Sequence, residues 1–96
     1  MNKSNHPGRS LVASQIRAAR ALIRWGAEDL SRASKVGLTT IRRAELTEHE
    51  TALTAANDLA IRRSLEAAGI EFIAENGGGP GVRLARRSTP AALPDD

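Results

Sequence analysis

Cysteine and tyrosine are absent from this sequence of 96 residues, and its only aromatic side chains are one tryptophan and one phenylalanine. Without cysteine the chain can form neither a disulfide nor a thiolate zinc site, which suits a reducing compartment. No stretch approaches the roughly 20 consecutive apolar residues that span a bilayer, so we expect a cytoplasmic protein with no membrane segment. The core has to be built from leucine, isoleucine, valine and alanine, which predicts a mainly α-helical fold.

A strong excess of one charge sign is also missing. The sequence has 14 Lys and Arg against 11 Asp and Glu, and its formal net charge is +3. A mildly basic surface favours polyanions such as nucleic acid without identifying one. The length suits a single compact domain, because a chain this short buries only about 60% of its unfolded surface.

The first helical pattern follows a polar N-terminal segment. Residues 1–11 are expected to form a flexible arm, since their polar, Pro- and Gly-containing start has no apolar period. The apolar residues after it recur at helical intervals, namely Val12, Ile16, Ala19 and Ile23. These residues form one stripe of a helix, which is predicted over residues 12–24.

Two short helices are predicted next, separated by a break of three residues. Glu28 and Asp29 place negative charge in the first turn of a helix over residues 27–34, where the helix dipole favours it. Residues 35–37 interrupt the pattern. A second short helix, with few apolar side chains, is predicted over residues 38–46.

A longer helix and a pair of strands complete the pattern. Thr54 can cap a helix that ends at Gly69, a good left-handed stop. The residues expected on its buried face are Leu53, Ala56, Ala60, Ile61, Leu65 and Ala68. Residues 70–87 contain two β-favouring runs on either side of a glycine-rich stretch, which predicts a β-hairpin. Residues 88–96 are rich in Pro and Ala, and we expect them to be disordered.

Two short helices joined by a three-residue turn are the helix-turn-helix unit of many DNA-binding proteins. Over residues 15–46 the sequence resembles the XRE or phage repressor/Cro-like family of transcriptional regulators. The C-terminal segment GIEFIAENGGGPGVRL resembles a hairpin that is common in short members of this family. The resemblance implies a four-helix, repressor-like helix-turn-helix domain over residues 12–69 with a C-terminal β-hairpin.

The same resemblance assigns structural roles to several residues. Arg20 and Glu45 match the two partners of an ion pair that is buried and structural in this family, not catalytic. The positions that hold the two short helices against each other are matched by Leu30, Ala33, Val36 and Ile41.

The resemblance also implies a DNA-binding surface on the second short helix. The matching residues there are Leu38, Thr39, Thr40, Arg42 and Arg43, and Lys35 lies in the turn before them. Arginine can bond bidentately to guanine, and threonine can offer a hydroxyl and a methyl group to base edges. We therefore expect double-stranded DNA as a partner and regulation, more specifically repression, as the function.

Several positions depart from the family pattern and keep other functions open. These are Ala27, Lys35, Gly37, Ala44 and Thr47, which replace the residues usual at the helix starts, in the turn, in the helix packing and after the second short helix. A degenerate helix-turn-helix that binds a protein partner, as an anti-activator would, is one alternative. An antitoxin that pairs with a toxin and represses its own promoter is another.

A homodimer is expected from apolar residues that a monomer would expose. Leu59 falls on the outer face of the fourth helix, and a two-stranded hairpin is only marginally stable alone. We therefore expect the hairpin to form a dimer interface with it. The expected interface residues are Leu59, Ile70, Phe72, Val82 and Leu84.

No pattern in the sequence predicts an enzyme, a metal site or a cofactor. The glycine-rich stretch before Val82 lacks the following helix that a phosphate-binding loop needs. His6 and His49 have no second ligand at a metal-like spacing. The acidic residues near Glu45 have no base or nucleophile beside them.

Overall fold

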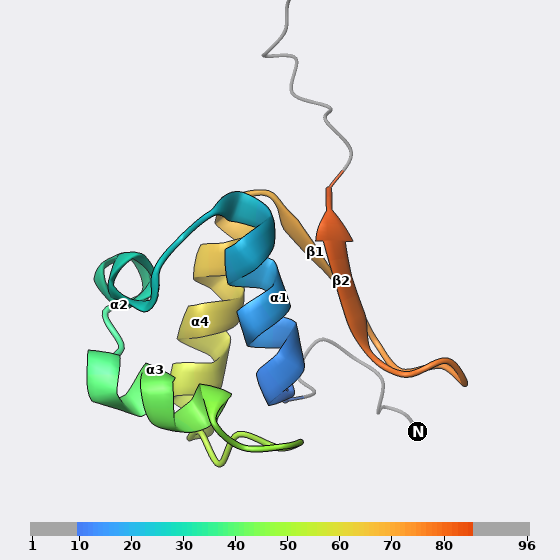
Figure 1. Cartoon of the computed structure of the whole chain (residues 1–96), viewed down its shortest axis with the longest axis horizontal. Coiled ribbons are helices and arrows are strands. Elements are labelled where there is room, and N and C mark those ends of the chain that lie inside the picture. Colours follow the sequence, from blue (N-terminus) through green and yellow to red (C-terminus); the bar gives the residue numbers. More distant parts are fainter. Residues whose placement is uncertain (1–9, 86–96) are drawn as a thin grey trace, which may run out of the picture.

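The computed structural model describes residues 10–85, which form a mostly helical domain with one antiparallel β-hairpin (Figure 1). The elements are α1 (Ala13–Ile23), α2 (Ala27–Ser34), α3 (Leu38–Glu45), α4 (Ala55–Ala67), β1 (Ile70–Ile73) and β2 (Gly81–Leu84). The predicted mainly α-helical fold with a C-terminal hairpin is confirmed. Most of the predicted arm and the whole predicted tail lie outside the described residues.

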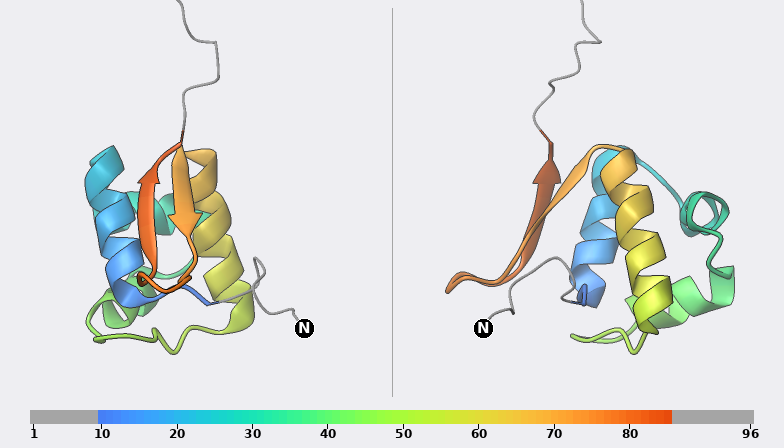
Figure 2. Two further views of the ribbon diagram at one scale, coloured as in Figure 1. Left: turned by 90° about the vertical axis from the view of Figure 1, so that its right-hand side faces the viewer. Right: turned by 180° about the vertical axis from the view of Figure 1, so that it is seen from behind.

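Helices α1 and α4 lie side by side at the centre of the domain, with other elements on both sides (Figures 1 and 2). The hairpin covers one face of this pair, because β2 contacts α1 and β1 contacts α4. On the other side α2 contacts α4, and α3 contacts α1. Six large side chains are fully buried between these layers: Leu11, Ile16, Leu30, Ile41, Ile61 and Leu65. One core therefore connects the hairpin to the two short helices.

The start of the packed domain differs from the prediction by one residue. Leu11, expected at the end of the arm, has no exposed surface and belongs to the core. Its backbone N–H donates a hydrogen bond of 3.0 Å to the Asp58 carboxylate on α4. An isolated β-bridge between Val12 and Glu50 also joins the chain before α1 to the loop after α3.

The buried face of α4 includes a charged residue that the hydrophobic pattern did not predict. Asp58 is only 6% exposed, whereas Ala56, expected on the buried face, is exposed. Successive residues are about 100° apart around a helix, so the face through Ile61 and Leu65 takes in position 58 and leaves position 56 outside. The predicted cap is confirmed, since the Thr54 hydroxyl accepts a hydrogen bond from the Asn57 N–H at 3.1 Å.

The hairpin packs on its own chain and does not stand alone. Its register pairs Ile70 with Leu84 and Phe72 with Val82, which places these four side chains on one face of the hairpin. Ile70 is only 2% exposed, and Phe72 and Val82 are partly buried against the core. Ile70 thus has almost no surface left for the dimer interface expected of it, whereas Phe72 and Val82 remain partly exposed. Leu84, 55% exposed, still faces solvent.

Gln15 of α1 binds the two residues at which the strands meet the hairpin loop. Its side-chain amide donates to the backbone oxygens of Ile73 at 3.4 Å and Gly81 at 3.1 Å. Its side-chain oxygen accepts a hydrogen bond from the Val12 N–H at 3.0 Å, which satisfies a free group at the start of α1. The hairpin was expected to need a second subunit for its stability. It is instead supported by α1 and α4 of the same chain.

Asp58 should make the stability of the domain depend on pH. Burial raises the pKa of its carboxyl above the ordinary value, and this effect exceeds the opposite effects of the Leu11 hydrogen bond and the Arg62 charge. The folded state thus holds the proton to a higher pH than the unfolded state. The stability contributed by this group falls as pH rises through the window just above the ordinary pKa of aspartate.

An Asp58→Asn variant keeps an acceptor for the Leu11 N–H but has no charge to bury. Its free energy of unfolding, relative to the wild type, is expected to increase as the pH is raised from about 3 to about 7. Urea unfolding across this range measures the difference, with Glu75→Gln as a control for loss of a carboxylate in an exposed loop. A difference that does not change with pH would show that the Asp58 carboxyl is not desolvated in the folded protein.

Candidate nucleic-acid interface

Helices α2 and α3 are joined by a short turn that three polar contacts close. Lys35, at the end of α2, takes a left-handed conformation with a φ of 67°, which costs a lysine more than a glycine. The Ser31 hydroxyl donates to the Val36 backbone oxygen at 2.7 Å, and the Ser34 hydroxyl accepts from the Val36 N–H at 3.1 Å. Lys35 donates its own N–H to the Ser31 backbone oxygen at 2.8 Å. The two serines therefore hold a turn whose left-handed position is occupied by a lysine.

Apolar residues on both sides of the turn fix the two short helices to the core. Leu30 and Ile41 are fully buried, and Val36 is 4% exposed, as their matched positions imply. Ala33 differs, because it is exposed and lines a shallow hollow against α4 with Trp25 and Arg63. Ser34, not Ala33, is the small buried residue at this end of α2.

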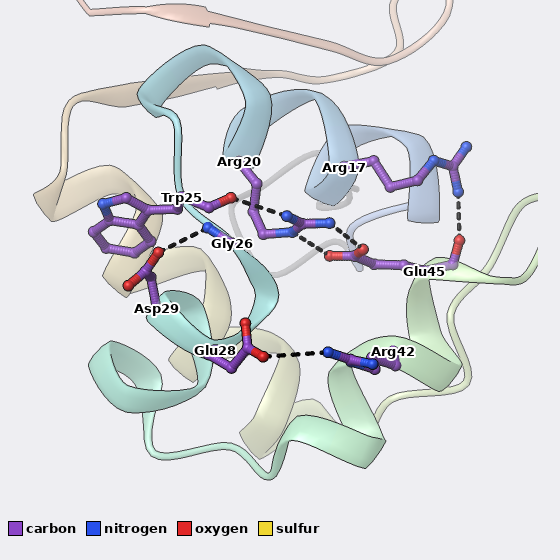
Figure 3. A network of polar contacts seen from close by, with 8 residues as sticks. All are labelled: Arg17, Arg20, Trp25, Gly26, Glu28, Asp29, Arg42 and Glu45. Atoms are coloured by element: carbon purple, nitrogen blue, oxygen red, sulfur yellow. Dashed lines mark hydrogen bonds and ion pairs between the residues drawn. The ribbon is translucent and has the colours of Figure 1, made fainter.

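An ion pair between α1 and α3 fixes the position of α3 (Figure 3). The Arg20 guanidinium donates from Nε and Nη2 to the two carboxylate oxygens of Glu45, at 2.8 Å and 2.7 Å. It also donates from Nη1 to the backbone oxygen of Trp25 at 2.9 Å, in the link between α1 and α2. Arg17 donates to the Glu45 backbone oxygen. One guanidinium therefore joins α1, the link to α2 and the C-terminal end of α3.

The surroundings of this pair are mostly closed to solvent. The Arg20 side chain is 21% exposed and that of Glu45 is 9% exposed. The hydrogen bonds to Glu45 raise the pKa of Arg20 above its ordinary value, against desolvation, and the charges of Glu45 and Glu28 act in the same direction. This is the ion pair that the family resemblance implies.

Helix α3 has one buried face and one solvent face. Ile41, Ala44 and Glu45 lie on the buried face. The six residues expected to contact DNA divide into four that are exposed, Lys35, Thr39, Arg42 and Arg43, and two that are half-buried, Leu38 and Thr40. The exposed ones bring two guanidinium groups and a threonine to the same side of one helix.

Leu46 belongs to this solvent face, although the sequence analysis did not include it. It is 83% exposed, and its φ of −85° and ψ of −11° continue the helical path of α3. Leu46 lies three residues after Arg43 and four after Arg42, so the three side chains share a face. The signal that could have identified it is this spacing.

The charges around α3 are partly compensated. Arg42 forms an ion pair with Glu28 at the start of α2, at 3.4 Å, and both side chains are 59% exposed (Figure 3). Arg32 pairs with Asp29 on α2 at 2.6 Å. Arg43 and Lys35 form no ion pair with any residue between positions 10 and 85. Arg43 is thus the arginine of α3 that is available to a ligand without breaking a contact.

Other chemistry is not indicated in the described part of the chain. Between residues 10 and 85, no three side chains of the metal-ligating types gather closely enough to hold an ion. None of the helices in the same range is long and apolar enough to cross a membrane. No protein-family model matches the chain, and no curated protein matches its sequence.

The burial of the Arg20–Glu45 pair should make it important for stability. An Arg20→Ala change leaves the Glu45 carboxylate with little solvent and is expected to cost about 2–3 kcal/mol, less than in a fully buried pair. The matched control is Arg83→Ala, because Arg83 and Glu71 also make two hydrogen bonds, at 3.1 Å and 2.9 Å, on the surface of the hairpin. Thermal and urea unfolding of both variants measures the difference.

The two variants should behave differently because the Arg20 pair is mostly buried and Arg20 also binds the Trp25 backbone oxygen, whereas the Arg83 pair is exposed. Arg83→Ala is expected to leave the melting temperature close to that of the wild type, since exposed pairs contribute little. Equal losses in the two variants would contradict the structural role given to Arg20.

Proposed function

We propose that this chain is a sequence-specific DNA-binding transcriptional regulator, in which α2 and α3 act as a helix-turn-helix and α3 enters the major groove. The observation that carries the proposal is the solvent face of α3. It presents Thr39, Arg43 and Leu46 on a helix whose other face is buried and whose end is fixed by Glu45. Side chains can form hydrogen bonds with base edges only if the helix that carries them is held in a fixed position.

The side chains on this face suit the edges of base pairs. Arg43 can donate two hydrogen bonds to guanine, and Thr39 can use its hydroxyl and methyl groups. Leu46 can make an apolar contact with the methyl group of thymine. This reading agrees with the resemblance to the XRE or phage repressor/Cro-like family, which the proposal includes. Occupation of an operator by such a domain excludes other proteins from it, so repression is the simplest form of regulation.

The weak net charge of the domain bears on how it would bind. Basic and acidic side chains are nearly equal in number between residues 10 and 85. Attraction to phosphates alone is then modest, and base contacts have to provide a larger share of the affinity. The proposal therefore predicts a clear preference for an operator over random DNA.

Selection of bound duplexes from a random pool is expected to yield a palindromic motif with half-sites about one helical turn apart. An Arg43→Ala change should cost about 1–3 kcal/mol of binding free energy at the base that Arg43 reads, and should relax the preference at that position. Titration of labelled duplexes measures both effects. Arg63→Ala is the matched control, because Arg63 is an exposed arginine on α4. Equal affinity for selected and random duplexes would contradict sequence-specific binding.

A palindromic operator requires two copies of the domain, and we include a homodimer in the proposal. Leu59 of α4 is 41% exposed and Leu84 of β2 is 55% exposed. Arg62, one turn after Leu59, lies over the Phe72 ring of β1 at 5.1 Å from its centroid. Leu59 is therefore near the border between α4 and the hairpin. The exposed side chains of Leu59 and Leu84 support the proposal of a dimer interface on this side.

The hairpin covers the faces of α1 and α4 that would otherwise be exposed, so its removal would disturb the core. Dimerisation is therefore best tested by a single substitution. A Leu59→Arg variant is expected to shift the protein from dimer to monomer in sedimentation at tens of micromolar, since it places a charge in an apolar contact. Leu22→Arg on α1 is the matched control, because Leu22 is also 41% exposed. A wild-type monomer under these conditions, or a dimer that tolerates Leu59→Arg, would contradict this interface.

A second candidate is a domain that binds a protein through the same face of α3, as an anti-activator or an antitoxin. The exposed Leu46 and the compensation of Arg42 by Glu28 favour it, because apolar and neutral surfaces suit protein partners. Absence of any preferred duplex in the selection would favour this candidate over DNA binding.

A further inference from the structure

We infer that Glu28 acts as an internal competitor of DNA, holding Arg42 and thereby lowering the affinity of the α3 face for DNA. This inference rests on the proposed function. It concerns a residue on α2 that does not belong to the expected reading face. Its basis is the geometry of Glu28, Arg42 and the start of α2.

The carboxylate of Glu28 lies where a phosphate would be favourable. Glu28 is the second residue of α2, so it stands at the N-terminal end of the helix dipole. In a helix-turn-helix, the first helix of the unit crosses the DNA backbone, and helix N-termini bind phosphate through free N–H groups. Glu28 thus brings a negative charge to the side of α2 that the DNA backbone would approach.

Arg42 is the group that this charge occupies. Its Nη2 lies 3.4 Å from Oε2 of Glu28, and this contact joins α2 and α3 across the turn (Figure 3). Both side chains are 59% exposed, so the pair contributes little to stability and can be broken at small cost. Binding of DNA has to exchange this contact for one with a base or a phosphate, while Glu28 is brought near the phosphates. Glu28 therefore opposes binding in two ways.

Asp29, the neighbouring carboxylate, has a different role. It accepts a hydrogen bond from the Gly26 N–H at 2.8 Å, which caps α2, and it pairs with Arg32 on its own helix. Its carboxylate is therefore bound by groups at the start of α2 and on α2 itself. Of the two acidic residues in this turn, Glu28 is the one whose side chain pairs with a residue of α3.

The test is a double-mutant cycle between Glu28 and Arg42, measured by binding to the duplex selected for the wild-type protein. Glu28→Gln is expected to tighten binding about fivefold at low salt, because it removes repulsion and releases Arg42. The dependence of log K on log salt should become steeper, because the variant brings one negative charge fewer to the DNA backbone. In the Arg42→Gln background, the gain from Glu28→Gln should fall below about twofold.

Glu75→Gln is the matched control, because it removes the same charge from the exposed loop of the hairpin, on the far side of α1 and α4 from α3. It is expected to change affinity much less than Glu28→Gln. Circular dichroism and the melting temperature establish that each variant is folded.

Two results would overturn the inference while leaving the proposed function intact. One is wild-type binding that Glu28→Gln leaves unchanged. The other is an equal gain in Glu28→Gln and Glu75→Gln, which would reduce the effect to net charge. Failure of the wild type and of every variant to prefer any duplex would overturn the proposed function, and this inference with it.

Discussion

The contact between the Arg20 guanidinium and the Glu45 carboxylate is the constraint on which the arrangement of this domain depends. Glu45 is the last residue of α3, and Arg20 reaches it from α1 while also binding the Trp25 backbone oxygen before α2. The apolar core alone could tolerate small rotations of α3, because leucine and isoleucine contacts have little directionality. A planar guanidinium that binds three oxygens permits far fewer arrangements. The solvent face of α3 is defined by this contact.

Local signals made most of the fold predictable from the sequence. The apolar intervals of α1, the acidic first turn of α2 and the Thr54 cap of α4 each act within a few residues, so sequence alone can reveal them. The hairpin was predicted from β-favouring residues on either side of glycines. The Arg20–Glu45 pair was available only through the family resemblance, since these residues are far apart in the sequence.

The features that sequence analysis missed depend on contacts between distant segments. Gln15 and Asp58 are polar residues, and neither hydrophobic spacing nor composition indicates that they are buried to bind the hairpin and Leu11. Ala33 was assigned to the helix packing through the family resemblance, and Ala56 to the buried face of α4 through helical spacing. Both are exposed, because alanine fits either environment. The pairing of Glu28 with Arg42 depends on the angle between α2 and α3, and this angle cannot be derived from the sequence.

The position of Trp25 has a consequence for observing this domain in solution. It is the only tryptophan, and the chain contains no tyrosine, so the fluorescence excited near 295 nm comes from one known place. That place is the link between α1 and α2, where the backbone oxygen of Trp25 is bound by Arg20 and its side chain lines the hollow against α4. Its emission is therefore a local spectroscopic reporter for the junction that orients α3, and no attached dye is needed to follow it.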